Sequence, residues 1–375
     1  MHIPDGYLSP ATCAVMYTAA APFWYIALQR VKRLLTTRLV PLLAVFSAFS
    51  FVIMMFNLPL PGGTTGHAVG MGIATIVLGP WGSMLSVSVA LLIQALFFGD
   101  GGITAFGANC FNMAIVGSLV AYWLYRAIAG RSAITSTRRV VAAAIAGYAA
   151  INVAALLTAI EFGVQPLLFT DASGAPLYAP YPLSVAIPAM ALGHLTIAGL
   201  AELVVTAGVV AYLQRADPSL LKATAPGARD SDEGVQDVAR RGGWRATQKL
   251  WVGLAILMIL SPLGLLAAGT AWGEWAPEDF NDPQVRQEIQ TGSLNAAAPE
   301  QAPEGLQRLS SVWTAPIPDY APTWMQSEGF GYVLSALMGG GLIILAFFLI
   351  SWIARLVRGN REPDVPAPRA GPGTV

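Results

Sequence analysis

Long apolar runs without a charge set the limits on how this chain can fold. Hydrophobic residues make up 55% of the 375 residues and charged residues only 11%, which is the composition of an integral membrane protein. A run of about 18 apolar residues is long enough to cross a bilayer as an α-helix. We therefore predict an all-α, polytopic bundle of membrane helices. The third predicted span is too short to cross alone and is expected to be tilted or partly re-entrant. The nine spans cover residues 12–29, 39–57, 68–79, 81–98, 105–127, 140–160, 183–213, 250–270 and 330–354.

The placement of basic residues orients these spans. Basic clusters follow the first, fifth, seventh and ninth spans. An external N-terminus therefore puts 19 of the 21 lysines and arginines on the cytoplasmic side and leaves only Arg286 and Arg308 outside. We predict a multi-pass protein of the cell (cytoplasmic or inner) membrane with an extracytoplasmic N-terminus and a cytoplasmic C-terminus. A cleaved signal peptide is the alternative, since residues 19–21 are all alanine, but no basic residue precedes Arg30.

Composition divides the chain into four parts. Residues 1–213 hold seven spans with short connections and form one transmembrane domain, and residues 214–249 are a polar cytoplasmic linker. Residues 250–357 form a two-span hairpin module around an extracytoplasmic loop, 271–328, in which nine acids face two bases. We expect this loop to be a small or partly ordered element. Residues 358–375 are rich in Pro and Gly and are predicted to be a disordered cytoplasmic tail.

The first candidate site contains two of the three histidines. A free Met1 amine, the His2 amide nitrogen and the His2 imidazole can close fused chelate rings around one metal ion, which no interior histidine can do. His67 lies in a glycine-rich stretch, 61–70, on the same side of the membrane, and would bring the donor set to four nitrogens. Near-planar nitrogen ligation suits Ni(II) or Cu(II), whereas Zn(II) prefers a tetrahedron. The alternative is a frayed His2 and a His67 satisfied by backbone, and the residues alone lean towards it, because two histidines without fixed spacing are a weak signal.

The second candidate site surrounds Asp100. Three glycines around it predict a tight external turn, and Gln94, Asn109 and Asn112 place amides inside apolar spans. Intramembrane polar groups line a pathway or hydrogen-bond neighbouring helices. Both interpretations stand for Asn112, whereas Asn109 lies nearer the outer face and is expected to support the site.

A third pair, His194 and Glu202, lies eight residues apart in the seventh span. That separation is about 12 Å along a helix axis, so the two side chains cannot ligate one ion. We expect His194 to be a core histidine paired to a neighbouring helix, and the role of Glu202 stays open.

Missing motifs exclude two enzyme classes. The sequence has no G-x-x-x-x-G-K-[ST] phosphate-binding loop and no H-E-x-x-H zinc motif. Without the phosphate-binding loop the chain cannot hydrolyse ATP by that route, and without the zinc motif it is not expected to be a metalloprotease. We predict that it is not an enzyme.

Five sequence motifs occur in a fixed order along residues 1–213. They are Met1-His2-Ile3-Pro4-Asp5-Gly6-Tyr7-Leu8, Gly66-His67, Phe98-Gly99-Asp100-Gly101-Gly102-Ile103-Thr104, Gly107-Ala108-Asn109 and Gly193-His194-Leu195. Through these motifs, residues 1–213 resemble the CbiM/NikM family, the substrate-capture (S) components of energy-coupling-factor cobalt and nickel transporters. Residues 250–354 resemble, through topology, the small auxiliary subunit fused in the NikMN arrangement.

The resemblance implies a function for the first two candidate sites. It implies that residues 1–213 capture a transported metal ion and that the protein needs no further cofactor. It also implies a transmembrane coupling (T) protein and cytoplasmic ATPase subunits as protein partners. The chain itself would contact the lipid bilayer and would bind no nucleic acid. The implied ligands are Met1, His2 and His67, with support from Asp5, Thr64, Thr65, Asp100 and Asn109.

Planar ligation by an amide nitrogen favours nickel, with cobalt the alternative. A self-sufficient secondary carrier and a membrane enzyme using His67, His194 and Glu202 compete with this function. The carrier would need an ionisable path that the spans scarcely offer, and the three enzyme residues lie at different depths.

Overall fold

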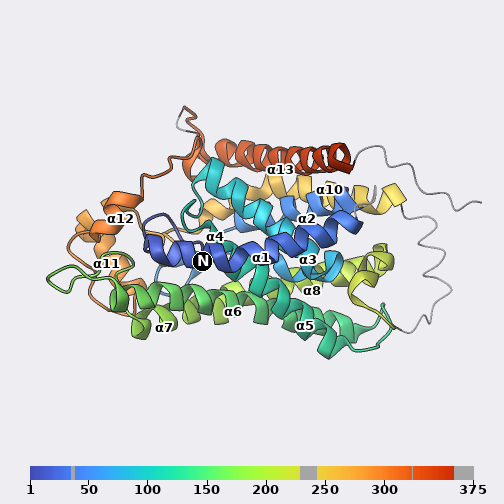
Figure 1. The fold of residues 1–375 in the computed structure, drawn as a ribbon, viewed down its shortest axis with the longest axis horizontal. Coiled ribbons are helices and arrows are strands. Elements are labelled where there is room, and N and C mark those ends of the chain that lie inside the picture. The colour runs from blue at the N-terminus through green and yellow to red at the C-terminus, as the bar shows by residue number, and fades with distance from the viewer. Residues whose placement is uncertain (35–38, 229–242, 323, 359–375) are drawn as a thin grey trace, which may run out of the picture.

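Apolar helices that share one long axis make up most of the molecule (Figure 1). The computed structural model describes residues 1–34, 39–228, 243–322 and 324–358. Within these residues seven helices are long and apolar enough to cross a membrane, and a shorter apolar helix, Val40–Met54, accompanies them. This confirms the predicted polytopic all-α fold. The main helices are α1 (Pro10–Leu34), α2 (Leu39–Met54), α3 (Met71–Ile93), α4 (Phe106–Asn109), α5 (Gly117–Ala129), α6 (Thr137–Leu168), α7 (Leu183–Gly193), α8 (Gly199–Ala216), α10 (Gly243–Leu260) and α13 (Glu328–Arg358).

The third and fourth predicted spans together form α3, which is not one straight rod. Gly79 has a left-handed φ of 73° with ψ 170°, and Pro80 follows it. Thr75 Oγ1 lies 3.0 Å from Ser83 Oγ, although eight residues of unbroken helix extend about 12 Å. The chain therefore folds back at Gly79, and residues 71–78 form the short inserted segment that the length of the third span predicts.

In the described part of the chain, three π-helical segments interrupt the long helices. They are η1 (Gln94–Phe98), η2 (Cys110–Val116) and η3 (His194–Ala198). A π-helical turn contains one residue more than an α-helical turn, and this extra residue rotates the side chains that follow it around the helix axis. Such segments are frequent at functional sites. All three lie next to polar residues that the sequence singled out, namely Gln94, Asn109, Asn112 and His194.

The two ends of the bundle differ. One end holds the start of α1, a short hairpin of β1 (Leu58–Leu60) and β2 (Thr64–Gly66), and the small helices α11 (Pro283–Gly292) and α12 (Glu304–Leu309) (Figure 1). The turn between α5 and α6, which carries a basic cluster, lies at the opposite end. The segment after α8 packs against α3, where Thr224 Oγ1 donates to Ile76 O at 2.7 Å. The middle of the predicted linker and the predicted tail lie outside the described residues.

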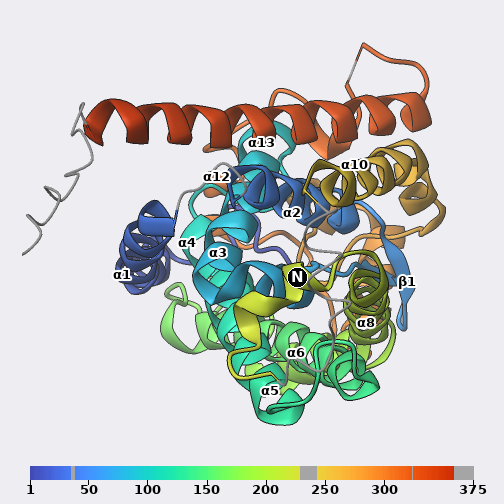
Figure 2. The ribbon, with the colours of Figure 1, turned by 90° about the vertical axis from the view of Figure 1, so that its right-hand side faces the viewer.

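The C-terminal helices cover α2. Both α10 and α13 pack against it, and α13 crosses the bundle obliquely in the end-on view (Figure 2). Between them, residues 271–328 hold buried Trp272, Trp275, Phe280 and Leu306. This loop therefore has more order than its acidic composition suggests, because its few large apolar residues pack against each other and against the helices of residues 1–213.

Candidate metal site

The N-terminus is buried inside the end of the bundle that holds the β hairpin, α11 and α12. The exposed fraction is 3% for Met1 and 1% for His2. The side-chain amide of Asn109 holds the backbone of Ile3 at both ends. Its Oδ1 accepts from Ile3 N at 2.8 Å and its Nδ2 donates to Ile3 O at 3.1 Å. A frayed terminus, the alternative interpretation of His2, is therefore wrong.

Asp5 ties the N-terminal arm to the turn after Asp100. Its carboxylate accepts from Ile103 N at 3.1 Å, from Thr104 N at 2.7 Å and from the Thr104 hydroxyl. A Cβ on Gly102 would lie only 2.4 Å from Asp5 N, so this close approach requires glycine. Asp5 and Asn109 thus fix the N-terminal arm against the turn that carries Asp100.

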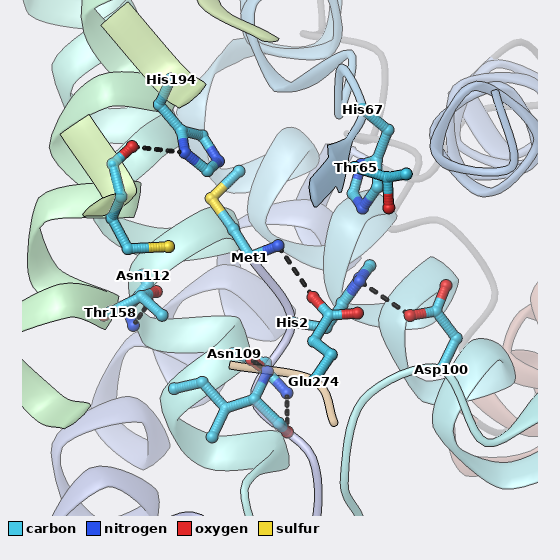
Figure 3. Close-up of polar contacts among 12 residues, drawn as sticks. Met1, His2, Thr65, His67, Asp100, Asn109, Asn112, Thr158, His194 and Glu274 are labelled. Carbon is cyan, nitrogen blue, oxygen red and sulfur yellow. Dashed lines mark hydrogen bonds and ion pairs between the residues drawn. The ribbon is translucent and has the colours of Figure 1, made fainter. Parts of the chain in front are cut away.

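The His2 ring points at Asp100 (Figure 3). His2 Nδ1 lies 2.8 Å from Asp100 Oδ1, but the contact lacks hydrogen-bond alignment, and neither ring nitrogen has a hydrogen-bond partner among the described residues. A buried imidazole without partners is costly, which is expected where an ion completes the site. Burial alone would raise the pKa of Asp100, but the interaction with the His2 ring outweighs burial and lowers that pKa. Gln94 Nε2 and the Tyr320 hydroxyl fix the other Asp100 oxygen at 3.1 and 2.5 Å.

His67 completes the nitrogen cluster. Its ring centroid lies 5.0 Å from that of His2, with the planes tilted by 33°. His67 Nδ1 lies 3.1 Å from Ala68 O, so this nitrogen donates and Nε2 carries the lone pair. Burial, and then the charges of His2 and the terminal amine, hold the pKa of His67 well below its usual value. A neutral His67 with Nε2 available is the form that ligates metals.

Glu202 fixes the loop that carries His67. Its Oε2 accepts from Val69 N and Gly70 N, both at 2.8 Å, and its Oε1 accepts from Gly72 N at 3.1 Å. The sequence showed a buried acid in an apolar span, but it could not show which loop the acid holds.

Glu274 reaches the site from the C-terminal module. The Met1 amine lies 3.0 Å from Glu274 Oε1. His2, Asp100 and Glu274 each offer a ligand atom, and these atoms lie within 4.8 Å of one another. Sequence reasoning missed this residue, and its only signal was the excess of acids in residues 271–328.

Thr64 and Thr65 connect the two modules. Thr65 N donates to Thr270 O at 3.4 Å and Thr65 Oγ1 to Gly269 O at 3.5 Å, while Thr64 packs against Gly292. Thr65 lies near His67 (Figure 3), so the β hairpin joins the His67 loop to the C-terminal module.

His194 and Asn112 each contact other parts of the fold. His194 Nδ1 lies 2.9 Å from Met190 O of its own helix, so the expected pairing with a neighbouring helix is wrong; Figure 3 shows its ring beside Met1. Asn112 Nδ2 donates to Thr158 Oγ1 at 3.1 Å and to Glu161 Oε2 at 2.8 Å. Asn112 thus joins η2 to α6, as the structural interpretation expects.

Comparison with known proteins relates the chain to metal transport. Residues 2–220 match the CbiM family, described as the cobalt uptake substrate-specific transmembrane region, and residues 247–356 match the PDGLE domain. The chain is 55% identical to the fused nickel transport protein NikMN of Rhodobacter capsulatus, covering 96% of this chain and 99% of that protein. It is 41% identical to the probable fused nickel transport protein LarMN of Lactiplantibacillus plantarum, over 93% and 96% of the two chains.

Two solved structures are also similar. A crystal structure of a transition metal transporter is 52% identical, with a TM-score of 0.55, and the match covers 60% of this chain and 98% of that chain. A truncated transition metal transporter is 53% identical, with a TM-score of 0.54, over 57% of this chain and 99% of that chain.

Proposed function

Because the chain belongs to the CbiM family, the cobalt uptake substrate-specific transmembrane region, we propose that it is the metal-capture subunit of an ATP-driven importer of the energy-coupling-factor type, with nickel as its cargo. The buried N-terminus carries this proposal. Its amine, the His2 ring, whose nitrogens lack hydrogen-bond partners among the described residues, and the Nε2 of His67 converge in one place. A chain terminus is normally frayed, so its burial among ligand atoms needs a functional reason.

The proposed ligands are the Met1 amine, the His2 amide nitrogen and imidazole, and His67. A deprotonated amide nitrogen is a strong-field donor, and a planar set of four nitrogens favours Ni(II) over Co(II). The names of the fused relatives, which are nickel transport proteins, support the same choice. Cobalt remains the second candidate, since the family description names cobalt uptake.

The proposed energy source is outside this chain. The sequence has no phosphate-binding loop, so ATP would act on cytoplasmic ATPase subunits that dock through a transmembrane coupling protein. The bundle end that carries the arginines would face the cytoplasm, and the N-terminus would face outward.

The structure disfavours a secondary carrier, the competing function. Such a carrier needs ionisable groups that are free to exchange protons or ions along the bilayer. Among the described residues, Glu202 caps the His67 loop, Glu161 accepts from Asn112, and His194 contacts its own helix. These side chains serve packing and positioning.

Reconstitution tests the proposal. The purified chain in liposomes should bind nickel but show no ATP-dependent accumulation, and adding the coupling protein and the ATPases should start accumulation. The His67→Ala variant with all partners is the control for uptake through the site. Accumulation against a gradient by the chain alone would overturn the proposal and favour the secondary carrier.

A further inference from the structure

An acidic cavity lies beside the metal site. Its volume is about 410 Å³, and it lies between the N-terminal arm and the 271–328 segment. Asp5, Glu274, Glu278 and Asp319 line it together with the glycines that follow Phe98. Carboxylates around a concave surface raise the local concentration of cations, so the cavity is suited to collect a divalent ion.

Glu274 lines this cavity and also contacts the buried Met1 amine, and Asp100 lies next to His2. The side chains of Glu274 and Asp100 are 20% and 17% exposed, whereas the side chains of Met1 and His2 are 0% and 1% exposed. One oxygen of each carboxylate and one His2 nitrogen lie within 4.8 Å of one another. Both nitrogens of the buried His2 ring lack hydrogen-bond partners among the described residues. A mixed set of two oxygens and one nitrogen suits a hydrated divalent transition-metal ion, and it differs from the four-nitrogen chelate.

We propose that Glu274 is the first protein ligand of the incoming divalent ion, which Glu274, Asp100 and His2 hold before it moves onto the terminal chelate. This rests on the proposed function, because the chelate is the destination. The ion exchanges bound waters for the two carboxylate oxygens and the His2 nitrogen, and no covalent bond of the protein changes. Glu274 leaves the Met1 amine as it turns to the ion, so taking up the ion also uncovers the next ligand.

The C-terminal module is therefore part of the loading route. Glu274 lies in residues 271–328, between α10 and α13, whereas every ligand of the proposed chelate lies within residues 1–67. The Tyr7 hydroxyl donates to Trp275 O at 2.8 Å and fixes the backbone next to Glu274. A rigid backbone with one movable carboxylate is the arrangement that a relay requires.

Loading kinetics test the relay. Metal-free full-length protein in lipid nanodiscs is mixed with NiCl₂, and quenching of tryptophan fluorescence reports association, which Trp275 beside Glu274 makes sensitive to the site. Glu274→Gln is compared with Glu278→Gln, an exposed acid in the same cavity. Both changes remove one charge from the cavity, so long-range attraction falls by a similar amount, and only the first removes the proposed ligand.

The relay predicts that Glu274→Gln lowers the association rate constant about tenfold or more below that of Glu278→Gln. The dissociation rate should fall with it, because the same ligand serves the return path, so the Kd should change less than either rate. Glu274→Asp keeps the charge and should load at an intermediate rate, and it serves as the test if the glutamine variant does not fold.

Three results would overturn the inference. Rates equal to those of Glu278→Gln would mean that Glu274 does not touch the ion. Faster loading of Glu274→Gln than of the wild-type protein would mean that Glu274 obstructs the Met1 amine and does not pass the ion on to it. A wild-type protein that binds no nickel would overturn the proposed function as well, whereas normal binding with unchanged rates would overturn the relay alone.

Discussion

Replacing Glu202 by glutamine should weaken metal binding without touching a ligand. The carboxylate holds three backbone N–H groups of the loop after His67, two on Oε2 and one on Oε1. Glutamine has one acceptor oxygen, so it can keep the pair at Val69 and Gly70. Its amide would then turn an N–H towards Gly72 N–H, and one buried donor would be left without a partner.

The size of the effect follows from these bonds. An orphaned buried N–H costs about 1–3 kcal/mol, and hydrogen bonds to a charged acceptor contribute about 1 kcal/mol more than neutral ones. One orphaned N–H and two bonds that change from a charged to a neutral acceptor together destabilise the loop by about 3–5 kcal/mol. The loop is also held through β2 and Thr65, so only part of this cost should reach His67. We expect the metal Kd to rise about 10- to 100-fold, at 1.4 kcal/mol for each factor of ten.

Competition with a chelator of known affinity measures this change on purified protein. Glu161→Gln is the matched control, because Glu161 is also a buried glutamate in an apolar span but contacts Asn112 in place of the His67 loop. Thermal unfolding of both variants shows whether they are folded. An unchanged Kd in folded Glu202→Gln, or an equal loss in Glu161→Gln, would refute the positioning role of Glu202.

Three further predictions concern the ligands themselves. One extra residue before Met1, or an acetylated amine, should abolish tight binding with both histidines intact, and normal nickel stoichiometry in equilibrium dialysis would contradict the terminal chelate. His67→Ala should lower affinity severely, whereas His194→Ala should lower mainly the melting temperature; comparable metal loss in both folded variants would reverse the assignment. Affinity should fall as pH falls, because ligation displaces protons from the amine and from the His2 amide. Burial lowers the pKa of His67, so His67 should stay neutral below the usual imidazole pKa of about 6.5, and a Kd that is flat from about pH 5 to 8 would exclude this ligand set.

The sequence predicted the parts of the molecule that depend on local chemistry. Backbone polar groups must be satisfied within each span in a bilayer, so apolar runs become helices with few alternatives. The closeness of the Met1 amine to His2 likewise follows from the sequence, because the two donors are neighbours in the chain; their joint ligation of a metal stays a prediction. His67 required the resemblance, since nothing in its spacing to His2 fixes a distance.

Contacts across the chain could not be predicted in this way. Glu274 lies 273 residues from Met1, and no local pattern relates the two positions. The helix arithmetic for His194 and Glu202 assumed a regular turn between them, whereas η3 lies within that interval. One extra residue in a helical turn leaves no signature in composition, so the sequence could not show how the side chains after His194 are rotated.

The contact between Glu274 and Met1 can open because other contacts hold the module in place. Helix contacts inside a bilayer gain little from apolar burial, since lipid is as apolar as the partner helix. The 271–328 segment is predicted to lie outside that region, where burying aromatic surface does stabilise association. Trp272 packs edge-on against Phe162 at 5.9 Å between ring centroids and lies 6.0 Å from the Tyr181 ring. In the proposed relay these aromatic contacts would hold the segment while the Met1–Glu274 ion pair beside them opens and closes, so the C-terminal module would admit an ion without leaving the bundle.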